Sequence, residues 1–329
     1  MSPLSKKAQP APVSQLLAPK HWPTWLGIGL LQLVVRLPYR VQLVIGRATG
    51  WLFRHINPYR RNVVRTNLTL CFPELGADER LQLEKACYSS LGCSLIETAT
   101  GLWGTPRLFE KYGFISGLEH LESAAQKGKG VILFSGHFCS VDFAGRVLLQ
   151  HYPVSYTYQE VRNPVFNRLI PRLRGKYIDN IIHRHNTRGF IKALRAGEVI
   201  WYAPDQDQSR KNSVFAPFFG IPTNTLTATT KLAKLTGAAV LPLTVERLPN
   251  ARGYSLSIQP ALENFPGDNE VTDATRTNAL IESQAREHPE QYLWLHRRFK
   301  TRPRGEPKLY PQKPRRVRRA KRKQRKAAP

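Results

Sequence analysis

The sequence has few acidic residues and few cysteines. Its 329 residues include 23 Asp and Glu against 50 Lys and Arg, so the formal net charge is +27. The four cysteines (Cys71, Cys87, Cys93 and Cys139) contain no C-x-x-C pair, so we expect no disulfide framework and no metal site. Reduced thiols in a cytoplasmic compartment and acidic partners fit this composition best.

The sequence also lacks an apolar run long enough to cross a bilayer. The apolar stretch from Trp22 to Val35 has 14 residues, whereas a membrane-spanning helix needs about 20. Residues 1–20 do not show the order of a signal peptide, with a basic start, an apolar run and a cleavage site. We predict that they form a flexible lead-in.

Arginines recur every seven residues after Pro38. Arg40, Arg47 and Arg54 therefore share one face of a predicted helix, with apolar residues largely on the other side. We interpret residues 21–56 as a membrane-associating helical segment, either interfacial or a short re-entrant or single-pass anchor. The alternative is a helical hairpin that packs on the core.

Residues 57–305 alternate predicted strands and helices. This alternation predicts an α/β fold with a mostly parallel central sheet flanked by helices. The predicted strands are 130–135, 153–158, 177–182, 198–203, 238–246 and 253–259. The predicted helices are 79–100, 141–150, 164–174, 187–196, 225–236 and 272–287.

Basic residues are concentrated at the C-terminus but not confined to it. Ten Lys and Arg follow Pro311, which leaves a net charge of +17 on the rest of the chain. We predict that residues 306–329 are a basic disordered tail that grips anionic lipid or does nothing specific. Nucleic-acid binding by counterion release is the alternative for the tail, but no specific nucleic acid is expected.

The segment Ser135–Asp142 is the strongest candidate for chemistry. His137 follows an apolar strand, and Asp142 falls at the start of the next predicted helix. Positions i and i+5 of one helix point about 140° apart, so the two can pair only if His137 lies in the turn before the helix. Gly136 suits such a turn, and Ser140 is a candidate N-cap.

Asp142 would then orient the His137 imidazole, leaving its other nitrogen to take a proton from a hydroxyl. No G-x-S-x-G elbow is present, so this dyad favours direct transfer to a substrate hydroxyl. The alternative is a buried histidine hydrogen-bonded near a helix start.

Further polar residues follow other predicted elements. Asp205 follows strand 198–203, so it is expected at the same sheet edge as His137. Asp205 and Asp207 could contact acceptor hydroxyls or support the dyad, or they could simply form a turn. Arg172 and Arg174 could clamp a phosphate, or they could lie on a solvated helix face.

Several blocks resemble the bacterial lipid A biosynthesis (late) acyltransferases, a branch of the lysophospholipid acyltransferase superfamily. His137 and Asp142 match the motif H-x-x-x-x-D/E, where many lipid A enzymes carry glutamate at the second position. The resemblance covers about residues 22–305. The other matching blocks are Arg61–Leu68 with Cys71–Glu74, Ile191–Leu194 with Trp201–Asp205, Val214–Gly220 and Pro289–Lys300.

The resemblance implies transfer of a fatty acyl chain from acyl carrier protein to a hydroxyl of a Kdo-modified lipid A precursor, at the cytoplasmic face of the cell inner membrane. His137 would be the general base and Asp142 its partner. The family has an acidic residue at the position of Asp205 and a functional arginine near Arg172 and Arg174. The resemblance implies no cofactor, and acyl-acyl carrier protein is the co-substrate.

Two other interpretations remain open at this point. One is an acyltransferase that acts on a glycerophospholipid or another glycolipid. The other, from a different class, is a basic nucleic-acid-binding protein with an inactive acyltransferase body.

Overall fold

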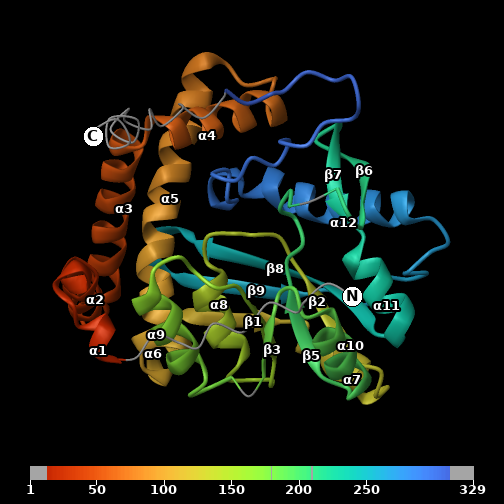
Figure 1. The fold of residues 1–329 in the computed structure, drawn as a ribbon, viewed down its shortest axis with the longest axis horizontal. Helices are drawn as coiled ribbons and strands as arrows, with labels where there is room; N and C mark the ends of the chain where they lie inside the picture. Colours follow the sequence, from red (N-terminus) through yellow and green to blue (C-terminus); the bar gives the residue numbers. More distant parts are fainter. Residues whose placement is uncertain (1–12, 179, 209, 312–329) are drawn as a thin grey trace, which may run out of the picture.

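A seven-stranded sheet forms the centre of the part of the chain that this computed structural model describes, residues 13–311 without 179 and 209 (Figure 1). Its order is β1-β9-β8-β2-β5-β3-β4, and the five strands from β8 to β4 are parallel. β9 pairs antiparallel with β8, and β1 lies parallel to β9. The strands are β1 (Gly113–Ser116), β2 (Val131–Phe134), β3 (Ser155–Tyr158), β4 (Ile181–His183), β5 (Val199–Tyr202), β8 (Ala239–Leu248) and β9 (Gly253–Ile258).

This architecture confirms the predicted α/β class and the mostly parallel sheet. The predicted strands correspond to β2, β3, β4, β5, β8 and β9. β1 was not predicted as a strand, and neither was the hairpin of β6 (Ser213–Phe218) and β7 (Ile221–Leu226). Pro217 and Pro222 lie opposite each other in it, and proline argues against a strand in sequence-based prediction.

Helices cover both faces of the sheet. The side chains of β2 alternate between two hydrophobic clusters: Val131 and Leu133 pack in one, and Ile132 and Phe134 in the other. The first cluster includes side chains of α6 (Pro106–Tyr112), α7 (Leu118–Gln126) and α8 (Val141–Leu148). The second includes α4 (Pro58–Cys71), α10 (Thr187–Arg195), α11 (Ala228–Thr236) and α12 (Glu270–Glu287). Burial on both faces explains why β2 is apolar at every position.

The predicted helices agree with the structure to within a few residues. They correspond to α5 (Ala77–Trp103), α8, α9 (Pro164–Arg174), α10, α11 and α12. α11 begins later than predicted because β7 continues to Leu226. Short 3-10 helices η2 (Pro249–Ala251) and η3 (Pro289–Gln291) follow β8 and α12.

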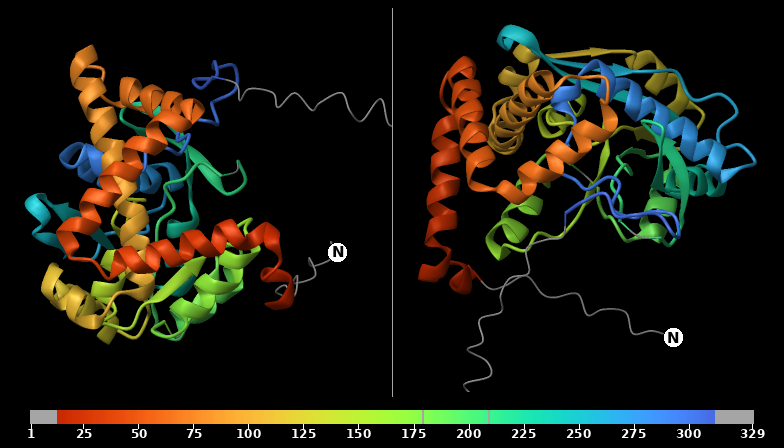
Figure 2. Two further views of the ribbon diagram at one scale, coloured as in Figure 1. Left: turned by 90° about the vertical axis from the view of Figure 1, so that its left-hand side faces the viewer. Right: turned by 90° about the horizontal axis from the view of Figure 1, so that it is seen from above.

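The N-terminal helices form an outer layer on one side of the molecule (Figures 1 and 2). They are α1 (Val13–Leu16), η1 (Pro19–His21), α2 (Trp22–Val35) and α3 (Tyr39–Ile56). α3 packs closely on α5: a Cβ at Gly50 would stand 1.9 Å from the Tyr88 carbonyl oxygen. In the described residues, no helix has the length and apolarity needed to cross a membrane.

Segment 21–56 packs partly on the core, and its association with a membrane stays a prediction. α3 packs on the core, as the hairpin alternative requires, yet apolar side chains of α2 stay exposed. Of the arginine stripe, Arg40 and Arg47 are exposed, and Arg54 bonds to buried Glu84 at 2.9 Å.

The predicted terminal segments lie largely outside the described residues. Residues 1–12 of the lead-in and 312–329 of the basic tail cannot be compared with the prediction. The described part of the lead-in contains α1 and η1. At the start of the predicted tail, Tyr310 is buried and its hydroxyl accepts a hydrogen bond of 3.1 Å from the Phe299 amide.

Candidate active site

His137 and Asp205 meet at the carboxyl edge of neighbouring parallel strands. β2 and β5 are paired up to Phe134 and Tyr202, and the ladder continues with the Ser135 amide donating to the Tyr202 carbonyl. The loops that leave the two strands therefore start side by side. This confirms the prediction that both residues lie at one edge.

Asp205 holds His137 through two hydrogen bonds. The imidazole Nδ1 bonds to Oδ1, and the His137 backbone amide donates to Oδ2 at 3.0 Å. The Asp205 side chain is 2% exposed, whereas that of His137 is 36% exposed. Nε2 has no hydrogen-bond partner among the described residues. A fixed imidazole with one free nitrogen open to solvent is the arrangement that a general base needs.

Electrostatics favour a charged Asp205 and a basic His137. Burial opposes ionisation of Asp205, but His137, its hydrogen bonds and Arg298 together hold the pKa of the carboxyl well below its usual range. Burial also opposes protonation of His137, but the Asp205 charge and hydrogen bond outweigh it and raise the pKa of the imidazole. The Nδ1–H bond to Asp205 leaves the Nε2 lone pair available in the neutral ring.

The predicted pairing of His137 with Asp142 is not the one found. Asp142 lies in the first turn of α8, as expected, but its carboxylate accepts from Thr98 at 2.7 Å and from Arg174 at 2.5 Å. These donors come from α5 and α9 and occupy both carboxylate oxygens. His137 meanwhile has Asp205 on its Nδ1, so Asp142 does not contact the imidazole.

Details of the predicted turn also differ. The Ser140 hydroxyl makes no capping bond and has no partner, and Gly136 does not adopt a positive φ. A Cβ at Gly136 would stand 2.9 Å from a methyl group of Ile281, so space rather than backbone conformation favours glycine here.

The structure distinguishes the two candidate arginines. Arg174 is half-buried and bound to Asp142, whereas Arg172, two residues earlier on α9, is exposed. Arg146 lies beside this pair, with its guanidinium 3.7 Å from the centre of the Tyr177 ring. The prediction that either arginine clamps a phosphate remains a prediction.

Asp207 is held by hydrogen bonds that stabilise the fold. Its carboxylate accepts from the Thr301 amide at 2.6 Å and from the Asn224 side chain at 3.1 Å. Its backbone amide donates to His296 at 3.0 Å. These bonds attach the loop after β5 to the C-terminal segment.

Three residues near the site were missed or left open by the sequence. Tyr292 donates its hydroxyl to Asp205 at 2.9 Å. Arg298, which lies in the matching block Pro289–Lys300, is buried and donates to the Asn224 carbonyl at 2.8 Å. Thr98 was not considered. A tyrosine beside the apolar residues Leu293–Leu295 was the available signal, because a buried hydroxyl needs a partner.

Cys139 is the nearest thiol in the motif, but it is not suited to act as a nucleophile. It is buried, and burial raises its pKa to about 11. A thiol with this pKa carries almost no thiolate at neutral pH. The arrangement thus fits base-assisted attack by a substrate hydroxyl better than attack by the Cys139 thiol.

The chain belongs to the bacterial lipid A biosynthesis acyltransferase family, whose profile matches residues 11–301. Among similar proteins, the lipid A biosynthesis palmitoleoyltransferase of Escherichia coli K12 is 39% identical over 90% of this chain and 97% of its own. The lauroyltransferase of the same organism is 37% identical over 90% and 97%. The myristoyltransferase is 26% identical over 90% and 92%.

This membership identifies the chain as an acyltransferase of lipid A biosynthesis and sets aside the two other interpretations. The solved structure of the 1-acyl-sn-glycerophosphate acyltransferase PlsC from Thermotoga maritima is 13% identical, with a TM-score of 0.36 over 78% of this chain and 99% of that one. That likeness is too weak to carry any property over.

Proposed function

We propose that this acyltransferase moves a fatty acyl chain from acyl carrier protein to a hydroxyl of a Kdo-modified lipid A precursor, with His137 as general base. The observation that carries this is the His137 imidazole, held by buried Asp205 at Nδ1 and free at Nε2. Asp205, rather than Asp142, orients the base in this mechanism.

In the proposed reaction Nε2 takes the proton from the acceptor hydroxyl as its oxygen attacks the thioester carbonyl. The C–S bond then breaks, and the thiolate of the carrier takes the proton from the imidazolium. The products are an ester on the precursor, a free carrier thiol and a neutral His137. Buried Asp205 stabilises the transient imidazolium.

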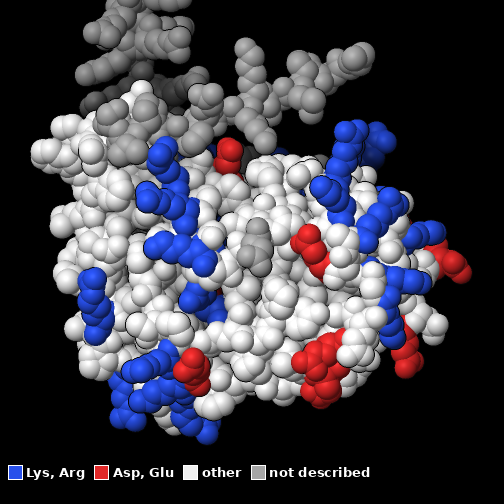
Figure 3. All heavy atoms as spheres, turned by 90° about the horizontal axis from the view of Figure 1, so that it is seen from below, with Lys and Arg blue, Asp and Glu red and all other residues white. Residues whose placement is uncertain are grey.

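Charge supports both proposed partners. The acceptor is an anionic lipid and acyl carrier protein is acidic, while this chain carries a net +27. On the face shown in Figure 3, Lys and Arg gather in groups along both sides and acidic side chains are fewer. Arg172 and Arg174, the two arginines predicted to clamp a phosphate, remain candidates for contact with the precursor, and Arg174 is paired with Asp142.

The test is mass spectrometry of lipid A from cells with and without this protein, with transfer assays on purified His137→Ala. We expect one added acyl chain in cells that carry the protein, and a loss of transfer of roughly 10³-fold in the variant. His185→Ala, which removes an exposed histidine, is the matched control and should transfer normally. Full activity of His137→Ala would refute the proposed mechanism, and an unchanged acylation pattern would refute the activity.

We further propose that α2 lies in the interface of the cell inner membrane, on its cytoplasmic face. Trp22, Leu26, Leu30 and Leu33 form an exposed apolar stripe on this helix at helical spacing. The neighbouring helix α3, which belongs to the same outer layer (Figure 2), carries the exposed side chains of Val44 and Trp51.

Flotation with vesicles that contain anionic phospholipid tests this location. The double variant Leu26→Glu with Leu30→Glu should lose most of its vesicle binding, because charges would enter the apolar interface. Phe114→Glu is the control, since Phe114 is also exposed but lies on β1. Equal binding of the double variant and the wild type would refute this placement.

A further inference from the structure

Tyr292 is buried beside Asp205 and comes from a distant part of the chain. It directly follows η3, 87 positions after Asp205, and is 5% exposed. Its hydroxyl donates to Asp205 Oδ2 at 2.9 Å. Tyr292 therefore contacts the carboxylate that holds the proposed base, without contacting the imidazole itself.

The segment that carries Tyr292 is attached to the His137 loop. The Leu293 amide donates to the His137 carbonyl at 3.0 Å, and the Cys139 amide donates to the Gln291 carbonyl at 2.8 Å. The bridge between Phe138 and Tyr292 is the centre of this short antiparallel contact. One segment thus fixes both the backbone of His137 and the acceptor of its side chain.

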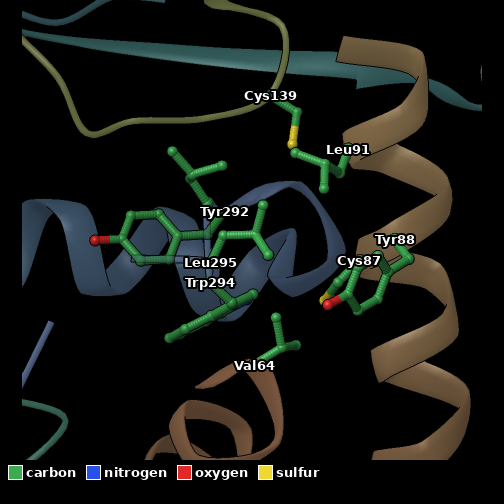
Figure 4. A pocket seen from close by; sticks show the side chains of 9 residues that line it. Val64, Cys87, Tyr88, Leu91, Cys139, Tyr292, Trp294 and Leu295 are labelled. Atoms are coloured by element: carbon green, nitrogen blue, oxygen red, sulfur yellow. The ribbon is translucent and has the colours of Figure 1, made fainter. Parts of the chain in front are cut away.

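Packing prevents the Tyr292 ring from turning away. Its centroid lies 4.7 Å from that of Trp294 and 5.3 Å from that of Phe138. In Figure 4 the ring borders a small apolar cavity lined by Leu91 and Cys139, and its hydroxyl points away from α5. The hydroxyl is therefore presented to Asp205 in one orientation.

Three hydrogen bonds reach the Asp205 carboxylate. Oδ1 accepts from His137 Nδ1, and Oδ2 accepts from the His137 amide and from Tyr292. Without the tyrosine hydroxyl, Oδ2 would keep a single donor, and more of the negative charge would act on the imidazole. The hydroxyl thus helps to orient the carboxylate and lowers the basicity of His137.

We propose that Tyr292 is a positioning residue of the transfer reaction, which orients Asp205 and limits its charge effect on His137. This inference rests on the proposed role of His137 as general base. A network of this kind gives the base a basicity suited to its task while the imidazole stays in one orientation.

Tyr292 is an uncharged hydrogen-bond donor among the titratable groups around the His137–Asp205 pair. Burial raises the pKa of Tyr292 well above its ordinary value, so it stays protonated. Arg298, from the segment after Trp294, is a fixed positive charge near Asp205. Burial lowers the pKa of His296 to about 4, so that ring is neutral at neutral pH. Asp207 is bound by the Thr301 segment, and Asp142 by Arg174.

The experiment compares the pH dependence of kcat/KM for the wild type and Tyr292→Phe in the full chain. Base catalysis needs neutral His137, so activity falls as the pH drops through the pKa of the imidazole. Removal of the hydroxyl concentrates charge on the imidazole side of Asp205 and raises that pKa. We expect the inflection to move to higher pH by about half a unit, with a loss of kcat of roughly 3- to 10-fold.

Tyr254→Phe is the matched control. Tyr254 is also a buried tyrosine that donates to a buried carboxylate, Glu97, at 2.7 Å. That cluster does not include His137, so the control should leave the inflection unchanged. A role in packing alone would affect both variants alike, whereas the shift in pH is specific to contact with Asp205.

A second variant covers the case in which Tyr292→Phe does not fold. Replacing Tyr292 by 3-fluorotyrosine keeps the ring and the hydroxyl but makes the hydroxyl a stronger donor, so the inflection should move to lower pH. An inflection that stays at the wild-type value in the folded variants would overturn the role of Tyr292. Retained transfer in His137→Ala would instead overturn the proposed function, so the two failures are distinguishable.

Discussion

The protein contains two buried carboxylates with similar partners and different surroundings. Asp205 is bonded to His137 and Tyr292, and Glu97 is bonded to Arg247 and Tyr254. Their side chains are 2% and 3% exposed. Each carboxylate thus has a basic partner and a tyrosine donor.

The two clusters differ in whether the basic side chain keeps a hydrogen-bonding atom without a partner. Arg247 donates to both oxygens of Glu97 and also to the hydroxyl and carbonyl of Ser90. His137 keeps Nε2 free, and its side chain is 36% exposed, against 12% for Arg247. A saturated cluster serves stability, whereas a cluster with one accessible unpaired atom can take part in a reaction.

The largest effect is expected for Asp205→Asn. The amide keeps the shape but loses the charge that fixes the tautomer and supports the imidazolium. Transfer in steady-state assays should fall by roughly 10³-fold, and the inflection of kcat/KM should move to lower pH. Circular dichroism should show a folded protein. Activity within about threefold of wild type would mean that Asp205 does not serve the base.

The second prediction concerns stability in the Glu97 cluster. Glu97→Gln leaves the Arg247 guanidinium buried without a counter-charge, so the free energy of unfolding should fall by about 3 kcal/mol. Urea unfolding gives this value. The folded fraction should keep the wild-type pH dependence of transfer. If stability is unchanged but transfer is lost, the functional distinction between the two clusters is wrong.

The third prediction is that stability and transfer activity depend on pH in opposite directions. The pKa of His137 is raised in the folded state. The His137–Asp205 pair therefore contributes its full stability below the unfolded pKa of about 6.5 and loses it as the pH rises through the folded pKa. Transfer has the opposite dependence and rises over the same interval, because it needs the neutral ring.

Thermal unfolding and kcat/KM measured from pH 6 to 9 check this opposition, with His137→Ala as the control for the histidine contribution to stability. Activity that falls across this interval as the pH rises would contradict a neutral imidazole as the base.

The smallest shift is expected for Asp142→Asn. Asp142 bonds to Thr98 and Arg174 and does not contact His137. Whatever its effect on the rate, the inflection of kcat/KM should stay within about 0.2 units of the wild type. Asp205→Asn in the same assay is the comparison. A shift of equal size in both variants would show that Asp142 pairs with the base during transfer, as the sequence predicted.

Local patterns in the sequence predicted much of the fold. Periodicity predicted α5 and the helices from α8 to α12, but it missed α4, α6 and α7. It also predicted most of the strands, because burial on both faces makes a parallel strand continuously apolar, as in Val131–Phe134. The hairpin of β6 and β7 was missed, since its prolines are poor strand residues and only its contacts with α12 reveal its setting.

The features of the site were likewise predicted only in part from the sequence. The sequence by itself determined that His137 follows a strand, that Asp205 follows another and that Asp142 begins a helix, because these are local properties of the chain. Only the tertiary structure decided which carboxylate pairs with the imidazole. That choice depends on donors from far along the chain: Arg174 and Thr98 bind Asp142, while Tyr292 supports Asp205. Competition among hydrogen-bond partners is a property of the folded assembly, and spacing along the chain does not contain it.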